Sequence, residues 1–183
     1  AGGINTQRSK LCKCGAVQLC FRNYDTRMRL ECSCFSCRQR HEWSVAQNCP
    51  GVKPYTSPTD LTWLDNAVTS VKGEDTLRTH ILRDGSDTRW LTCIDCSSVL
   101  VISNPLYKGN IVAVPRATAT LQCHDTMMPC ARIQTREWSK RKVGEGYLDE
   151  TEMPPWSHEG PVLDGRSTMK MIWNLYWNGF LKA

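Results

Sequence analysis

Cysteines are the residues of this chain whose type and spacing indicate chemistry. The chain has 11 of them, and seven fall into three short groups. The groups are Cys12 and Cys14, then Cys32, Cys34 and Cys37, and finally Cys93 and Cys96. An odd number of cysteines, grouped as CxC, CxCxxC and CxxC, favours metal binding in a reducing compartment over a disulfide framework. Zinc, or a similar metal that prefers thiolate ligands, is the expected cofactor.

The spacing within the groups predicts how they share metal ions. If residues 12–14 form a strand, both cysteines point to one face, because side chains two residues apart on a strand do so. A CxxC turn presents two more thiolates. The first and third groups together can therefore form a closed tetrahedral site of the structural type. We call this set the four-cysteine cluster: Cys12, Cys14, Cys93 and Cys96.

The middle group offers only three ligands, and we call Cys32, Cys34 and Cys37 the three-cysteine cluster. Three protein ligands with an open fourth position are typical of a catalytic zinc site. Two alternatives remain open: the site is empty, which leaves one zinc ion per chain instead of two, or a further side chain closes it. The candidates for that fourth ligand are Cys49, Cys123, His41 and His124. The cysteines outside the groups, expected to be buried as small apolar residues, are Cys20, Cys49, Cys123 and Cys130.

Segments that alternate between apolar and polar residues, bounded by turn residues, predict a mainly β domain of antiparallel strands. The expected strands are 11–21, 27–34, 61–64, 68–71, 76–82, 89–93, 98–103 and 110–115. Apolar residues at helical spacing predict a short amphipathic helix over about 167–180. The expected organisation is a lead-in at 1–10, a zinc-binding β domain at 11–156 and a C-terminal extension at 157–183. No apolar run is long enough to span a bilayer.

The formal net charge is +5, and the positive excess lies in residues 1–60, which contain nine Lys and Arg against four Asp and Glu. This excess has two interpretations: it offsets the negative charge of metal-bound thiolates, or it attracts an acidic partner. A basic run at 136–142 is a candidate contact for nucleic acid, since phosphate binding requires little more than such charges. Its basic residues are Arg136, Lys140, Arg141 and Lys142.

The cysteine groups also carry a family resemblance. CKCGAV at 12–17, CSCFSCR at 32–38, the segment at 72–100 that contains CIDC, and GNIVAVP at 109–115 resemble the family of the glutathione-dependent formaldehyde-activating enzyme and centromere protein V. The resemblance covers about residues 10–156. It implies a β-tent fold, a structural zinc in the four-cysteine cluster and a catalytic zinc in the three-cysteine cluster. The enzymes of that family are carbon–sulfur lyases that act on glutathione adducts such as S-hydroxymethylglutathione.

Under this resemblance, Arg38 and Arg40 are the expected contacts for the carboxylates of glutathione. The sequence departs from the family pattern at several positions close to the cysteines. These positions are Ser33 and Arg132, where a His is common, and Glu42 and Ser97, where a Gly is usual. We expect Glu42 either to block access to the three-cysteine cluster or to supply its fourth ligand.

Three functions follow from these patterns. The first is a non-catalytic accessory subunit of a larger assembly, in which the Trp-rich helix at 167–180 docks on a partner protein, since Trp is enriched at interfaces. That helix could instead pack on its own domain or lie on a membrane surface. The second function is a zinc-dependent carbon–sulfur lyase, and the third is a nucleic-acid-contacting component of a ribonucleoprotein. The sequence begins at Ala1 rather than Met. A removed presequence would explain this and suggests a mitochondrial location, although a trimmed sequence would explain it equally.

Overall fold

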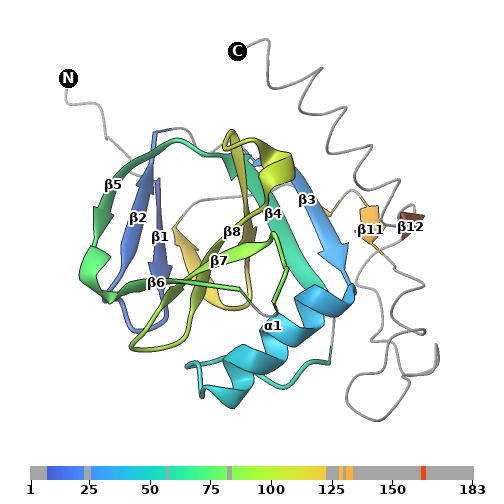
Figure 1. Ribbon diagram of the computed structural model, residues 1–183, viewed down its shortest axis with the longest axis horizontal. Helices are drawn as coiled ribbons and strands as arrows, with labels where there is room; N and C mark the ends of the chain where they lie inside the picture. The colour runs from blue at the N-terminus through green and yellow to red at the C-terminus, as the bar shows by residue number, and fades with distance from the viewer. Residues whose placement is uncertain are drawn as a thin grey trace.

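The computed structural model describes residues 8–22, 26–56, 58–81, 84–122, 128–129, 131–133 and 162–163. The helix expected over 167–180 and the basic run at 136–142 lie outside these ranges. The strands are β1 (Arg8–Cys12), β2 (Gln18–Phe21), β3 (Thr26–Cys32), β4 (Thr59–Asp65), β5 (Val68–Lys72), β6 (Leu77–His80), β7 (Arg89–Cys93), β8 (Val99–Ser103), β9 (Ile111–Pro115), β10 (Ala119–Gln122), β11 (Ala131–Ile133) and β12 (Val162–Leu163) (Figure 1). The helices are α1 (Phe35–Ala46) and the short 3-10 turns η1 (Glu74–Thr76) and η2 (Pro105–Tyr107). Within the described part of the chain, no helix has the length and apolar character needed to cross a bilayer.

The strands form two sheets. The smaller sheet has the order β10-β1-β2-β5, and the larger has the order β12-β11-β3-β4-β9-β8-β7-β6. Neighbouring strands are antiparallel except where β11 pairs with β3 and with β12. The prediction of a mainly β domain is therefore confirmed, and each predicted strand segment overlaps an observed strand. The strands β10, β11 and β12 have no counterpart among the predicted segments.

The middle of the larger sheet is buried on both faces. In β9, Ile111 and Ala113 pack into one apolar cluster, while Val112 and Val114 pack into another. In β8, residues 99–102 are all buried. A strand that is covered on both faces reads as a continuous apolar run instead of an alternating one. This burial explains the sequences VLVI and IVAV at the centre of the sheet.

The two apolar clusters place the larger sheet between the smaller sheet and α1. The cluster that contains Val112 and Val114 combines Leu19 and Phe21 of the smaller sheet with Leu64 and Leu100 of the larger one. The cluster that contains Ile111 and Ala113 lies on the opposite face of the larger sheet, and the partly buried Trp43 of α1 packs against it. Figure 1 shows α1 running beneath the ends of the larger sheet's strands. The helix thus closes the side of the sheet that the smaller sheet leaves uncovered.

The helix α1 was not among the predicted elements. Its most buried residues are Cys37, Arg40 and Ser44, which are spaced three and four residues apart and so share one helix face. Because that face carries a charged and a polar residue, the segment lacks the apolar stripe by which an amphipathic helix is recognised. The helix ends before Asn48, which has a left-handed conformation (φ 56°) that Asn adopts more readily than most residues.

The core can be tested with two leucines of different exposure. Leu100 is fully buried between the sheets, whereas Leu106 in η2 is 55% exposed. Leu100→Ala should lower the free energy of unfolding by about 2–5 kcal/mol, because it creates a cavity as well as removing apolar contacts. Leu106→Ala should change it by less than about 0.5 kcal/mol. Urea titration of the metal-loaded protein measures both values, and equal effects of the two substitutions would contradict this core.

Candidate metal centres

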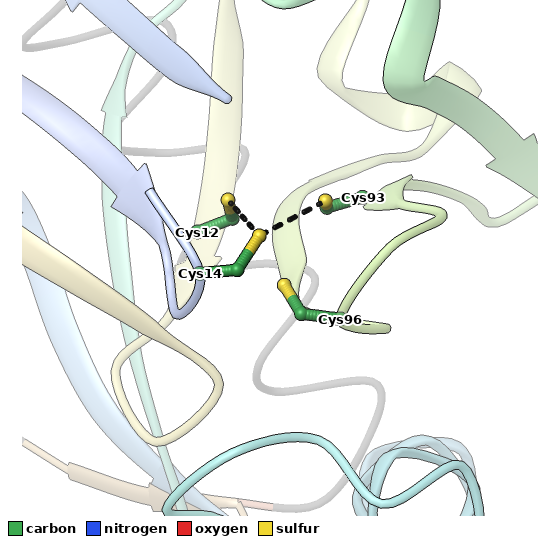
Figure 2. Close-up of side chains that lie close together, drawn as sticks. All are labelled: Cys12, Cys14, Cys93 and Cys96. Atoms are coloured by element: carbon green, nitrogen blue, oxygen red, sulfur yellow. Dashed lines mark hydrogen bonds between the residues drawn. The ribbon is translucent and has the colours of Figure 1, made fainter. Parts of the chain in front are cut away.

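The four-cysteine cluster joins the two sheets. Cys12 is the last residue of β1 in the smaller sheet, and Cys14 lies in the turn that follows. Cys93 is the last residue of β7 in the larger sheet, and Cys96 lies in the turn between β7 and β8. Figure 2 shows the four sulfur atoms gathered at one point between these turns. The structure therefore brings all four predicted ligands together, although Cys14 reaches the cluster from a turn and not, as expected, from a strand.

The spacing of the sulfur atoms fits a single tetrahedral metal ion. The Sγ of Cys14 lies 3.4 Å from the Sγ of Cys12 and 3.8 Å from that of Cys93, and all four sulfurs lie within 4.8 Å of one another. Four thiolates bound at about 2.3 Å to one zinc ion would be about 3.8 Å apart. Four soft thiolates in this arrangement suit zinc or iron rather than a hard cation such as magnesium. The cluster could therefore hold a metal ion.

Two left-handed residues shape the turns that present these thiolates. Gly15 has φ 80° and Ser97 has φ 55°. The first turn allows the backbone N–H of Val17 to donate a hydrogen bond to Cys12 Sγ over 3.2 Å. In the second turn, the N–H of Ser97 donates to the carbonyl oxygen of Cys93 over 2.9 Å. The position of Ser97 has a positive φ, a conformation for which Gly is the usual residue.

The buried Ser98 side chain contacts the sulfur of Cys96. Its hydroxyl oxygen accepts a hydrogen bond from the backbone N–H of Lys13 over 2.9 Å and lies 3.1 Å from Cys96 Sγ. Burial raises the pKa of Cys96, but hydrogen bonds from the Ser98 hydroxyl and from the backbone N–H groups of Cys14 and Ser98 lower it to about 7. A thiolate is therefore available at this position near neutral pH. Hydrogen bonds of this kind orient metal ligands and increase metal affinity.

The three-cysteine cluster lies where β3 ends and α1 begins. Cys32 is the last residue of β3, Cys34 is the N-cap of α1 and Cys37 is in the first turn of the helix. Their sulfur atoms lie within 4.8 Å of one another. The N-terminal end of a helix carries partial positive charge, which favours thiolates. The strand predicted over 27–34 is therefore shorter than expected, because it stops at Cys32 and the helix begins directly after Cys34.

The three thiols differ in their protonation. The pKa of Cys37 lies well below its ordinary value, because the Cys32 and Cys34 thiols donate hydrogen bonds to it and the Arg40 guanidinium lies beside it. The pKa of Cys32 is raised by its hydrogen bonds to Cys34 and Cys37 and by burial. The hydrogen bond that Cys34 receives from Cys32 lowers the pKa of Cys34. The hydrogen bond between Cys34 and Cys37, together with the burial of Cys34, raises that pKa to about 12. Without metal the cluster therefore keeps one thiolate, and metal binding would release the remaining protons.

The two arginines expected to contact glutathione are both engaged within the protein. Arg38 Nε donates to the carboxylate of Glu42, four residues further along α1. Arg40 is only 3% exposed, and its Nη2 lies 3.5 Å from Cys37 Sγ. Glu42 is paired with Arg38 and is not part of the group of sulfur atoms. The expectation that Glu42 supplies the fourth ligand is therefore not supported by the structure.

The described Cys, His, Asp and Glu residues provide no fourth member of the three-cysteine cluster. His41 Nε2 lies 2.7 Å from the carbonyl oxygen of Lys53. Cys49 is buried at the other cluster, with its Sγ 3.6 Å from Ser98 Oγ. Cys20 is buried as expected. The remaining candidates and isolated cysteines, which lie outside the described residues, are Cys123, His124 and Cys130.

The other departures from the family pattern lie close to the three-cysteine cluster. Ser33 is fully buried between Cys32 and Cys34. Arg132 lies on β11, where it is opposite Glu31 of β3.

The helix α1 extends from one cluster to the other. It begins at the three-cysteine cluster, and its 12 residues cover about 18 Å. Near its far end, Ser44 Oγ donates to the carbonyl oxygen of Ser97 over 3.5 Å. Cys49, just beyond the helix, contacts Ser98 Oγ. The two ends of α1 are therefore attached to the two sets of cysteines.

No family model and no curated protein matches this chain. The chemistry of the clusters therefore rests on the geometry of the cysteines.

The four-cysteine cluster can be tested by removing two of its ligands. The double substitution Cys14→Ser and Cys96→Ser leaves only two thiolates. It should lower the metal content by one ion per chain and lower the melting temperature, because hydroxyl oxygen is a poor ligand for a metal that prefers thiolates. Cys20→Ala changes a buried cysteine of β2 outside both clusters, and it should leave the metal content unchanged. Native mass spectrometry of the zinc-loaded chains counts the ions. A doubly substituted chain with full metal content would contradict the assignment.

Proposed function

We propose that this chain is a zinc-binding protein with a structural site in the four-cysteine cluster and a second site in the three-cysteine cluster. The observation that carries the proposal is the convergence of distant cysteines at sulfur distances that suit tetrahedral zinc. Zinc would stabilise the fold at the closed site and supply a Lewis acid at an open one. The same clusters support membership of the glutathione-dependent formaldehyde-activating enzyme and centromere protein V family, with its β-tent fold.

Within that family, we infer a non-catalytic, accessory role in a larger assembly. The support for this role is the engagement of the two arginines that would bind the carboxylates of glutathione. Arg38 is paired with Glu42, and Arg40 is buried against Cys37. A glutathione adduct would have to break the first pair or reach an interior guanidinium. The arrangement therefore favours a protein that has kept the metal sites without the substrate contacts.

The partner protein would bind the C-terminal extension. Residues 167–183 carry Trp173, Trp177 and Phe180 at helical spacing. Large aromatic side chains of this kind commonly supply the binding energy of an interface. The nine described cysteines are free thiols, which supports a reducing compartment inside the cell. A mitochondrial location is part of the same proposal.

A zinc-dependent carbon–sulfur lyase is the second candidate, and one observation favours it. Among the described residues, the three-cysteine cluster has no fourth ligand, and its Cys34 is partly exposed. A metal ion with an open position beside an accessible thiolate could take the sulfur or oxygen of a glutathione adduct. Because Arg38 holds Glu42, the carboxylate of Glu42 does not fill this position.

The accessory role can be tested with a truncated chain. Deleting residues 167–183 should release the protein from its assembly and leave its zinc content unchanged, because the deleted segment contains none of the seven ligands. Affinity purification from native cells, followed by quantitative mass spectrometry and metal analysis, compares the two forms. Lys182→Ala, a polar change within the same segment, serves as the control and should keep the partners.

Two outcomes would contradict this role. One is a truncated chain that keeps stoichiometric partners. The other is turnover of S-hydroxymethylglutathione to formaldehyde and glutathione by the purified 183-residue chain, if Cys34→Ser abolishes it while the zinc of the four-cysteine cluster remains. That second result would replace the accessory role with the lyase. A chain that binds no zinc would refute both candidates.

A further inference from the structure

The buried guanidinium of Arg40 needs an explanation that packing alone does not give. Arg40 lies in the middle of α1 and is 3% exposed. Its guanidinium carbon lies 4.7 Å from the centroid of the Trp90 ring, and its Nη2 donates to Cys37 Sγ over 3.5 Å. Burial of a charged group is costly unless an opposite charge or several hydrogen bonds compensate it. One long contact to the Cys37 sulfur and an aromatic ring satisfy only part of this charged group.

The remaining donors of Arg40 strengthen this point. Its Nε and Nη1 atoms are buried and have no hydrogen-bond partner among the described residues. An arginine that served only to hold α1 on Trp90 would be expected to satisfy these donors. The arrangement instead leaves a fixed positive charge, with two unsatisfied donor atoms, directly beside the three-cysteine cluster.

The positive charge of Arg40 is opposite to the net charge of a metal-loaded cluster. Three thiolates and one divalent ion carry a net charge of −1, which Arg40 brings to zero. An anionic fourth ligand would then add to a neutral centre and not to a negative one. Resting on the proposed zinc site, we propose that Arg40 is a positioning residue that offsets the charge of the three-cysteine centre. In this role Arg40 favours the binding of anionic ligands, such as a small thiolate, at the open fourth position.

Other arginines of the chain show what an ordinary ion pair looks like. Arg27 donates to both carboxylate oxygens of Asp65, over 3.0 Å and 2.6 Å. Its side chain is 26% exposed, and its charge is compensated locally. Arg40 differs because its guanidinium donates its hydrogen bond to the sulfur of Cys37, a proposed metal ligand. Arg27→Met is therefore a matched control for Arg40→Met, since both replace an arginine by a neutral side chain of similar length.

The test uses the 183-residue chain loaded with cadmium-113, which replaces zinc at thiolate sites and reports its ligands by NMR. The four-cysteine cluster should give one signal that does not respond to added ligand. The three-cysteine cluster should give a second signal that shifts when 2-mercaptoethanol binds. Titration with 2-mercaptoethanol and, separately, with neutral imidazole gives an affinity for each ligand. The first signal also reports whether each variant is folded.

Arg40→Met should weaken thiol binding at least about tenfold, because attraction between unit charges a few ångströms apart exceeds that amount even when partly screened. It should change imidazole binding by less than about threefold. Arg40→Lys, which keeps the charge, should retain the thiol affinity of the unmodified chain, and Arg27→Met should change neither affinity. If Arg40→Met loses the first signal and so fails to fold, Arg40→Gln takes its place with the same expected result.

Equal weakening of thiol and imidazole binding, or no weakening of either, would overturn the role of Arg40. Loss of thiol affinity in Arg40→Lys would also overturn it, because the effect would then come from packing and not from charge. These results are distinct from failure of the proposed function. That failure would appear as the absence of the second cadmium signal in the unmodified chain.

Discussion

The structure depends on bringing four cysteine sulfurs from two sheets to one point. One pair comes from the end of β1 and its turn, and the other comes from the end of β7 and its turn. Buried thiolates repel one another unless a cation compensates them. The metal ion is therefore the proposed link between the sheets, and the apolar cluster around Leu19 and Leu100 fills the space beside it. In such a site, metal binding and folding are parts of one equilibrium.

The second centre depends on the first through α1. The helix carries two ligands of the three-cysteine cluster at its start and contacts the turn of Cys93 and Cys96 through Ser44 near its end. Its buried face is polar, so apolar packing contributes less to its position than in an ordinary amphipathic helix. The clusters, the Arg40–Trp90 contact and the partly buried Trp43 hold it on the larger sheet. One helix thus contacts both cysteine clusters, although the clusters share no cysteine.

The sequence predicted the strands well because their signal is local. Apolar runs bounded by turn residues mark β4, β8 and β9, and each of these strands is buried as a run implies. The two cysteine clusters could also be foreseen, because CxC and CxxC spacings restrict which sulfurs can share an ion. The strands β10 and β11 were missed because each is only three or four residues long. Their pairing depends on distant strands and not on their own pattern.

The helix and the charged residues of the second site could not be predicted in the same way. The buried face of α1 includes Arg40 and Ser44, whose residue types are usually found at the surface. The pairing of Arg38 with Glu42 depends on their facing each other across one helical turn, and it was invisible until the helix was known. The position of the guanidinium of Arg40 depends on Trp90, 50 residues away in the chain. Such non-local contacts decide whether an arginine is available to bind a substrate or is buried in the interior.

Zinc K-edge X-ray absorption of the purified 183-residue chain tests the central claim, that the fold builds one closed and one open thiolate centre. The account predicts two zinc ions per chain, zinc–sulfur distances of about 2.3 Å, and an average of between three and four sulfur ligands per zinc with a minor contribution from a lighter atom. A single zinc ion bound by four sulfurs would contradict the open centre. An average of two sulfurs or fewer would contradict both.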